Sequence, residues 1–207
     1  RTVGIYKERI DMKTTEQQHN ERKAELMEKC FECYAENGLS GVGIRALGQY
    51  CQTNPANLYT YFKDVDDLII QSTEYCMSKI EDDFMAKAPT CAEDLDKFID
   101  EIPYWTAETH GKKYRLMYQV YTHPKYHEYG KKFFEGVDRR YTEYANALAD
   151  KLGIPADILR AMIFVFIRAS IHYALFEDEF YLQEQLKLLK AGIKIYLGKF
   201  VDKGGNN

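Results

Sequence analysis

Side chains that can hydrogen-bond to bases and phosphates are concentrated between Arg45 and Lys63. Asn57 is the first candidate for reading a base, because an asparagine amide can bond N6 and N7 of adenine together in the major groove. Arg45 stands at the start of a helical segment, where side chain and helix dipole both favour a phosphate. The candidates for contact with DNA are Arg45, Thr53, Asn54, Ala56, Asn57, Tyr59, Thr60, Tyr61 and Lys63. Two alternatives stay open, since Asn57 also suits a cap and the ring of Tyr59 also suits the core.

Two short helices are predicted to hold these side chains. The first has residues at i, i+3, i+4 and i+7 that share one face, namely Ile44, Leu47, Gly48 and Cys51. Asn54 can cap the second helix, and Pro55 fits its first turn, where a missing N–H costs nothing. Leu58 and Phe62 then share a face at i, i+4. The pattern predicts a helix-turn-helix, whose second helix enters the major groove of DNA.

The segment Leu58-Tyr59-Thr60-Tyr61-Phe62, followed by Leu68, resembles the signature of TetR-family transcriptional regulators. The flanks agree, with Asn37-Gly38 before the motif and Arg45 at the start of its first helix. The resemblance covers roughly residues 20–70. It implies a homodimer that binds a palindromic operator, represses transcription and is released by a small molecule.

Three positions depart from the family pattern. The usual turn glycine falls on Gln52, and the threonine that usually caps the first motif helix falls on Gly43. The lysine often found three residues after the motif phenylalanine falls on Val65. That lysine normally contacts a phosphate, and Lys63 is the candidate to replace it.

The chain beyond residue 100 is rich in aromatic side chains at helical spacing. A plain helical core would use more leucine, isoleucine and valine, whereas a cavity lined by rings with a few hydroxyls suits a mostly apolar ligand. An aromatic-rich core without a ligand is the alternative. The predicted effector-binding residues are Trp105, Tyr114, Met117, Tyr118, Tyr121, Phe133, Tyr141, Phe166, Arg168 and Tyr173.

Other chemistries find little support. Cys30-x-x-Cys33 has no second ligand pair at zinc spacing, and Glu16-x-x-His19 occurs once where a di-iron bundle needs two copies. His123 and His127 flank a predicted helix boundary. No Ser-His-Asp order, glycine-rich phosphate loop or paired carboxylates stand out, so we expect neither a metal, nor a cofactor, nor an enzyme. The alternative functions are a helical carrier or enzyme with the aromatic bundle as its site, and a helical adaptor.

Composition limits the partners and the compartment. The chain has 207 residues and a net charge of −4, and residues 14–66 carry five Lys and Arg against eight Asp and Glu. Five cysteines without a signal peptide suggest reduced thiols in a cytoplasm. The wholly apolar run Ala161–Ile167 is far shorter than the roughly 20 residues that span a bilayer, so we expect no membrane association.

The periodicities predict an all-α protein of two domains. Residues 14–66 would form a three-helix DNA-binding domain, with a capping box at Thr14 starting its first helix. Residues 67–203 would form a helical bundle for effector binding and dimerisation. Pro103 is expected to end or kink a helix. The homodimer is predicted to form through helices 155–176 and 177–200, with Phe166 and Leu189 in its interface.

Overall fold

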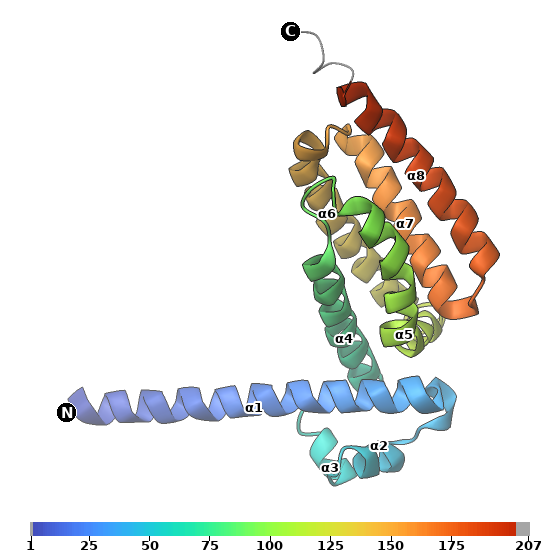
Figure 1. The fold of residues 1–207 in the computed structure, drawn as a ribbon. Coiled ribbons are helices and arrows are strands. Elements are labelled where there is room, and N and C mark those ends of the chain that lie inside the picture. Colours follow the sequence, from blue (N-terminus) through green and yellow to red (C-terminus); the bar gives the residue numbers. More distant parts are fainter. Residues whose placement is uncertain (1, 202–207) are drawn as a thin grey trace. The chain divides into compact units, whose positions relative to one another are not determined.

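The structure is a computed structural model that describes the backbone of residues 2–201 and the side chains of residues 15–197 (Figure 1). Within that range the chain forms helices and no strand, so the predicted all-α fold is confirmed. The helices are α1 (Thr2–Asn37), the short 3-10 helix η1 (Leu39–Gly41), α2 (Ile44–Tyr50), α3 (Pro55–Leu58), α4 (Val65–Lys87), α5 (Leu95–Tyr121), α6 (His127–Leu152), α7 (Ala156–Phe176) and α8 (Glu179–Val201).

The chain divides into two compact units between Lys79 and Ile80, a point that lies within α4. The predicted functional boundary at residues 66 and 67 assigns all of α4 to the effector domain and stays a prediction. Each unit has its own core of buried side chains.

The first unit is held together by one face of α1 that packs on the helix-turn-helix. Phe31 and Cys30 of α1 are almost completely buried, as are Leu47 and Leu58 of α2 and α3. The Sγ atoms of Cys30 and Cys51 lie 3.5 Å apart, so two small apolar thiols fill the contact between α1 and the end of α2.

Two local predictions about helix ends differ from the structure. The first helix was predicted to begin at Thr14, but α1 begins at Thr2, and a capping box is not needed where the preceding turn is already helical. Pro103 was predicted to end or kink a helix, but α5 continues through it from Leu95 to Tyr121. Buried neighbours such as Ile99 and Ile102 anchor this part of α5, so tertiary packing offsets the missing backbone hydrogen bond.

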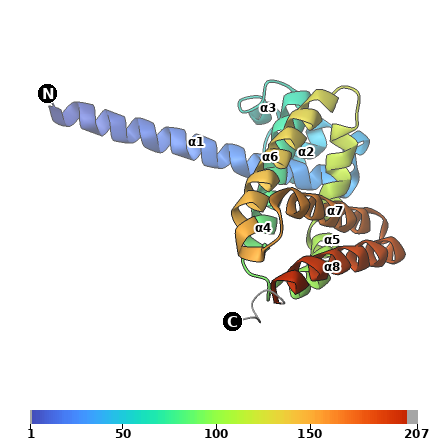
Figure 2. The ribbon, with the colours of Figure 1, turned by 90° about the horizontal axis from the view of Figure 1, so that it is seen from above.

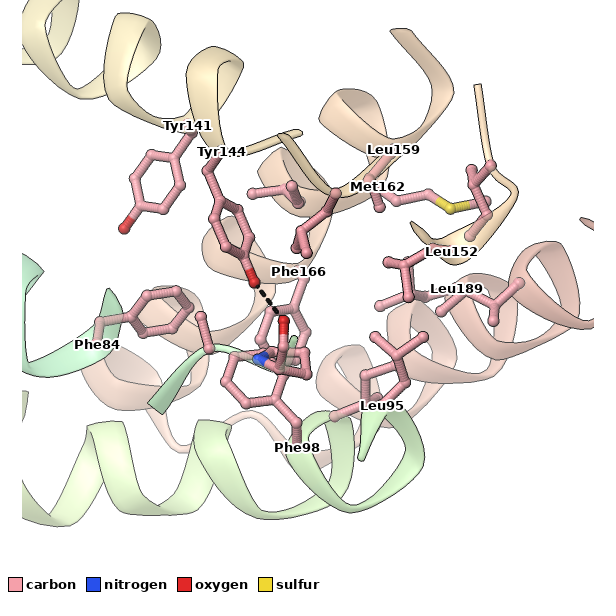
Figure 3. A pocket seen from close by; sticks show the side chains of 17 residues that line it. Phe84, Leu95, Phe98, Tyr141, Tyr144, Leu152, Leu159, Met162, Phe166 and Leu189 are labelled. Carbon is pink, nitrogen blue, oxygen red and sulfur yellow. Dashed lines mark hydrogen bonds between the residues drawn. The ribbon is translucent and has the colours of Figure 1, made fainter. Parts of the chain in front are cut away.

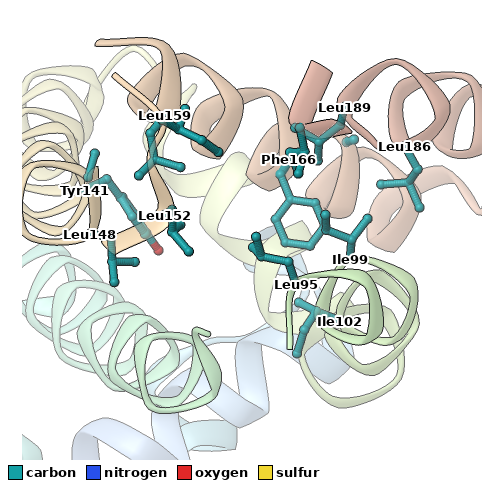
Figure 4. Close-up of a cluster of buried hydrophobic side chains, with 14 of the residues drawn as sticks. Leu95, Ile99, Ile102, Tyr141, Leu148, Leu152, Leu159, Phe166, Leu186 and Leu189 are labelled. Carbon is teal, nitrogen blue, oxygen red and sulfur yellow. The ribbon is translucent and has the colours of Figure 1, made fainter. Parts of the chain in front are cut away.

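In the second unit α7 packs against α5, α6 and α8. Figures 1 and 2 show α7 and α8 side by side as an antiparallel hairpin. Apolar side chains of all four helices meet in one core (Figure 4), including Ile99 of α5, Leu148 of α6, Phe166 of α7 and Leu186 of α8. Phe166 and Leu189 were predicted to face a partner subunit, but both are buried in the chain's own core.

Helix α7 is apolar over a longer stretch than the run Ala161–Ile167 indicated. An 18-residue stretch of this 21-residue helix has a mean hydropathy of 1.6, enough to cross a membrane by length and composition alone, and a third of that stretch is buried within the fold. A core helix of a soluble protein passes the same test, and α7 packs against three neighbouring helices. Its remaining apolar surface therefore needs another explanation.

Candidate nucleic-acid interface and ligand cavity

The helix-turn-helix forms as predicted, with a very short second helix. The Asn54 side chain accepts a hydrogen bond from the backbone N–H of Ala56 at 2.9 Å, and Pro55 occupies the first turn of α3. After Leu58 the chain continues in turns, in which the N–H of Tyr61 and of Phe62 both donate to the Leu58 carbonyl. Gly48 lies close to Pro55, because a Cβ at position 48 would be 2.9 Å from the proline ring. The turn therefore depends on the absence of a side chain there.

Buried anchors fix which side of this segment faces outward. Leu58 and Phe62 have 0% and 2% of their surface exposed, so their i, i+4 face packs inward. Asn57, Thr60 and Lys63 are exposed. The Asn57 amide donates to Thr53 Oγ1 at 3.3 Å, and the Thr60 hydroxyl donates to the Asn57 carbonyl at 2.7 Å.

The two tyrosines of the motif differ in their surroundings. Tyr59 is 49% exposed, so its ring lies outside the core. Tyr61 is half-buried and stacks on the ring of His19 from α1, with centroids 4.7 Å apart. A ring held in this way is less available to a nucleic acid than that of Tyr59. Ala56 and Asn54 are exposed and Thr53 is half-buried.

Ion pairs reduce the number of cations that this unit can offer. Glu25 bonds both Arg22 and Lys29, and Lys79 bonds Glu28. Arg45 and Lys63 are exposed and form no ion pair with the side chains that the structure describes. Two exposed cations therefore flank α3 along the chain, one on each side, despite the acidic composition of residues 14–66.

The second unit contains a small apolar cavity of about 60 Å³ (Figure 3). One polar bond crosses the lining: the Tyr144 hydroxyl donates to the Pro89 carbonyl at 2.8 Å, and burial raises the pKa of Tyr144 to about 12. The cavity is lined by Phe84, Ala88, Pro89, Leu95, Phe98, Ile99, Tyr141, Tyr144, Leu148, Leu152, Ile154, Leu159, Met162, Ile163, Phe166, Leu189 and Ile193.

Two of the predicted effector residues, Tyr141 and Phe166, line this apolar cavity. The others lie elsewhere in the second unit. Arg168 donates to the Tyr118 hydroxyl at 3.3 Å, and Tyr121 contacts Phe133 with ring centroids 5.2 Å apart.

The remaining predicted residues also have partners or lie in the core. The ring of Tyr173 contacts Tyr104, and that of Trp105 contacts His110. Tyr114 and Met117 are buried. The sequence analysis named two residues of the cavity wall and overlooked the aliphatic side chains that form most of it; which residues bind an effector stays a prediction. The helical spacing of these aliphatic residues was the signal in the sequence that could have revealed them.

Two buried polar groups of the second unit were also overlooked. His110 is 3% exposed, and neither of its ring nitrogens has a hydrogen-bond partner; its Nε2 lies 3.9 Å from a carboxylate oxygen of Asp83. Burial lowers the pKa of His110 and raises that of Glu81. One carboxylate oxygen of Glu81 lies 3.0 Å from Arg140, and the other has no hydrogen bond. Both groups stand on otherwise apolar helix faces, which is how a sequence could reveal them.

No three His, Cys, Asp or Glu side chains within residues 15–197 are grouped so that they could hold a metal ion.

The fold is that of TetR-family transcriptional regulators. A TetR-family regulator from Streptomyces coelicolor has a TM-score of 0.59 at 17% identity, over 86% of this chain and 97% of that one. FadR from Bacillus subtilis, solved in complex with stearoyl-CoA, has a TM-score of 0.55 at 18% identity, over 80% of this chain and 96% of its own. FadR from Bacillus halodurans, a fatty acid degradation regulator, has a TM-score of 0.57 at 14% identity, over 85% and 94%.

No protein-family model matches the sequence, and a search of curated proteins finds no match. At identities of this size the likeness concerns the fold. The similar structures are described as those of transcriptional regulators.

Proposed function

We propose that this chain is a cytoplasmic DNA-binding transcriptional regulator, which represses by binding a palindromic operator as a homodimer and is released by a small apolar effector. The observation that carries the proposal is the helix-turn-helix, in which Leu58 of α3 and Phe62 of the following turn are buried and Asn57 is exposed. A carrier or an enzyme built on the same helical bundle has no need of that arrangement.

Side chains of the helix-turn-helix would make different kinds of contact with DNA. Asn57 would read a base, since its amide is exposed and bonds only the neighbouring Thr53 among the described side chains. Arg45 and Lys63 would contact phosphates, which hold the protein in register and carry no sequence information. Tyr59 and Thr60 would add hydroxyl contacts.

A second copy of the chain would cover the exposed apolar surface of α7 and α8. Tyr181, Leu188 and Ile195 follow one another at i, i+7 and i+14 on α8, and are 39%, 68% and 58% exposed. Val165 of α7 is 40% exposed. An exposed apolar stripe of this kind suits an interaction site, and a two-fold axis lets the same stripe meet itself. Two recognition helices would then meet half-sites about 34–36 Å apart.

The effector would occupy the apolar cavity. Its lining of aliphatic and aromatic side chains suits a hydrocarbon, and the FadR structure from Bacillus subtilis holds stearoyl-CoA. Release from DNA requires that the ligand bind the DNA-incompetent state more tightly, since equal affinity for both states shifts nothing.

Selection of DNA fragments by the purified protein tests the proposal, and an enriched inverted repeat is the expected result. On that repeat Asn57→Ala should lose discrimination at particular base pairs, by about 1–3 kcal/mol for a good contact. Arg45→Ala should weaken binding to all sequences alike. Lys112→Ala, which removes an exposed cation from the second unit, is the control.

If the selection recovered no inverted repeat, the proposed function as a regulator would be rejected. A small-molecule carrier would then be the better interpretation, because the apolar cavity favours it independently of any DNA. If Asn57→Ala weakened all sequences equally, the base-reading role of Asn57 would be wrong.

A further inference from the structure

The contact between α1 and the end of α2 brings two free thiols together in the first unit. The Sγ atoms of Cys30 and Cys51 lie 3.5 Å apart, and both side chains are completely buried. A disulfide bond holds its sulfurs about 2.05 Å apart. A further approach of about 1.5 Å would therefore turn this contact into a covalent bond.

The other two buried thiols of the first unit have other partners. The Sγ atom of Cys33 accepts a hydrogen bond from the Asn37 amide at 3.9 Å. The Cys76 thiol donates to the Met27 carbonyl at 3.9 Å. The geometry therefore favours the pair formed by α1 and the end of α2 over any other combination of these cysteines.

The surroundings of the pair make Cys51 the thiol that ionises more readily. Hydrogen bonding from Cys30 lowers the pKa of Cys51. Lys29 and Arg22 of α1 act in the same direction, whereas burial and Glu25 oppose them. The same sulfur contact, together with burial, raises the pKa of Cys30. Because the thiolate is the reactive form of cysteine, Cys51 is the sulfur expected to react first.

We propose that a peroxide oxidises Cys30 and Cys51 to a disulfide, which ties the end of α2 to α1 and weakens binding to the operator. The effect on DNA rests on the proposed function, whereas formation of the bond does not. Disulfides of cytosolic proteins are usually transient and redox-sensing, which suits a bond that forms only under oxidising conditions.

The oxidation takes two steps. The Cys51 thiolate attacks one oxygen of hydrogen peroxide, the O–O bond breaks, and the departing hydroxide takes up a proton to give water, which leaves a sulfenic acid on Cys51. The Cys30 sulfur then attacks the Cys51 sulfur, the S–O bond breaks, and hydroxide leaves as water with the Cys30 proton. Two thiols and one peroxide thus give one disulfide and two waters.

The peroxide would reach the pair through local opening of the turn after α2. Cys51 is buried, but its chain neighbours Tyr50 and Gln52 are exposed. Gln52 also has a left-handed backbone conformation, with φ at 52°, which strains the turn. Exposed segments with few buried contacts open at low free energy, so the rate of oxidation should follow the opening of this turn.

The turn would transmit a displacement of Cys51 to α3. The Thr53 N–H donates to the Gly48 carbonyl at 2.8 Å, and a Cβ on Gly48 would lie 2.9 Å from the Pro55 ring. Close packing of this kind leaves no space to absorb a shift. Pulling the end of α2 toward α1 would therefore move Asn57, whose hydrogen bonds to a base depend on distance and angle.

Peptide mapping after peroxide treatment tests the bond. The reduced full chain would be treated with hydrogen peroxide, quenched with acid and digested with pepsin at low pH, where thiol–disulfide exchange stops for lack of thiolate. Mass spectrometry should find the Cys30 and Cys51 peptides joined, at a mass two hydrogens below their sum. Dithiothreitol should separate them.

Single variants test the order of the two steps. In Cys30→Ala, oxidation should stop at a sulfenic acid on Cys51, which dimedone traps. In Cys51→Ala, Cys30 should stay reduced. Cys33→Ala removes another buried thiol from α1 and is the matched control, which should still form the disulfide. Thermal unfolding shows whether each variant is folded, and the map of the native chain does not depend on any of them.

The affinity for the inverted repeat recovered by fragment selection measures the effect on DNA. The oxidised native chain should bind about tenfold more weakly than the reduced chain, as expected for the loss of one good base contact. Dithiothreitol should restore the affinity. Peroxide should leave the affinity of Cys51→Ala unchanged, and Cys33→Ala should show the same loss as the native chain.

Three results would overturn the proposal. Peroxide could leave both Cys30 and Cys51 reduced, it could join a different pair of cysteines, or the bond could form without a change in affinity for the repeat. If the selection recovered no inverted repeat, the proposed regulator would fall together with the effect on DNA. The peptide map would still decide whether the bond forms.

Discussion

Gln52 adopts a left-handed backbone conformation, with φ at 52°, in the turn between α2 and α3. Such a conformation costs an L-residue roughly 1–2 kcal/mol, and glycine avoids this strain at the price of a more flexible unfolded chain. Gln52→Gly should therefore stabilise the protein by about 0.5–1 kcal/mol in urea unfolding. Gln49→Gly, on an exposed position inside α2, should destabilise it by about 1 kcal/mol. Equal effects of the two variants would contradict the strain argument.

The buried imidazole of His110 should make stability depend on pH. Burial is the main cause of its lowered pKa, with Lys113 acting in the same direction and Asp83 opposing it. The unfolded chain therefore binds a proton more readily than the folded one, so stability is full above the ordinary histidine pKa of about 6.5 and declines as pH falls below it. Thermal unfolding between pH 5 and pH 8 measures this decline.

The variant His110→Phe should flatten the profile in that range, whereas His127→Gln, at an exposed position, should leave it unchanged. The difference between the native and His110→Phe profiles gives the contribution of His110 to the pH dependence. Glu81 contributes with the opposite sign, because its pKa is raised by burial and its contribution to stability grows as pH falls. An unchanged slope in His110→Phe would show that other groups cause the acid sensitivity.

At the scale of elements, the contact between α2 and α3 allows no side chain at Gly48. A Cβ there would lie 2.9 Å from Cγ and Cδ of Pro55 and 3.0 Å from the Thr53 carbonyl oxygen, and neither a proline ring nor a backbone moves easily. Gly48→Ala should destabilise the protein by about 1–3 kcal/mol and weaken operator binding. Gly41→Ala, where nothing lies within 4 Å of the new Cβ, should do neither. An operator affinity that survives Gly48→Ala would contradict the dependence of the turn on glycine.

The elements most easily predicted were those defined by local chemistry. Asn54, Pro55 and the apolar spacing from Ile44 to Phe62 specify the helix-turn-helix within a few turns, and the structure forms it. The continuity of α5 through Pro103 depends on packing between distant segments. One sign of this is Gly111, where a Cβ would lie 3.1 Å from the Ala174 carbonyl oxygen of α7. Sequence patterns within one helix cannot predict a contact between two helices that are distant in the chain.

The apolar cavity was the least predictable feature. Its wall combines Phe84, Leu95, Leu148, Phe166 and Leu189 from five helices, and chain spacing says which face of a helix is apolar but not which faces enclose an empty space. Aromatic enrichment singled out Tyr141 and Phe166, which line the cavity, together with other rings that pack elsewhere; the effector-binding role of all of them stays a prediction.

At the scale of the whole molecule, the apolar stripe on α8 predicts the oligomeric state. The double variant Leu188→Glu, Ile195→Glu should sediment as a monomer and lose cooperative operator binding, because buried like charges would face each other across the two-fold axis. Lys187→Glu, on the same helix but outside both the stripe and the core face, should remain dimeric. Dimers of unchanged stability in the double variant would exclude this face.

The cysteines of the two units differ in exposure, so their alkylation rates report local unfolding. Cys30, Cys33, Cys51 and Cys76 are buried in the first unit, while Cys91 is partly exposed in the second unit. Hydrogen bonding to Asp94 and Glu93 raises the pKa of Cys91, so alkylating reagents label it best in mild alkali. The other four sulfurs react only when the first unit opens, and their modification rates therefore give the free energy of that opening. Mass spectrometry of alkylated peptides would show whether operator DNA slows alkylation of the first unit's cysteines. The same experiment on the same unmodified chain would show whether a ligand slows alkylation of Cys91 in the second unit.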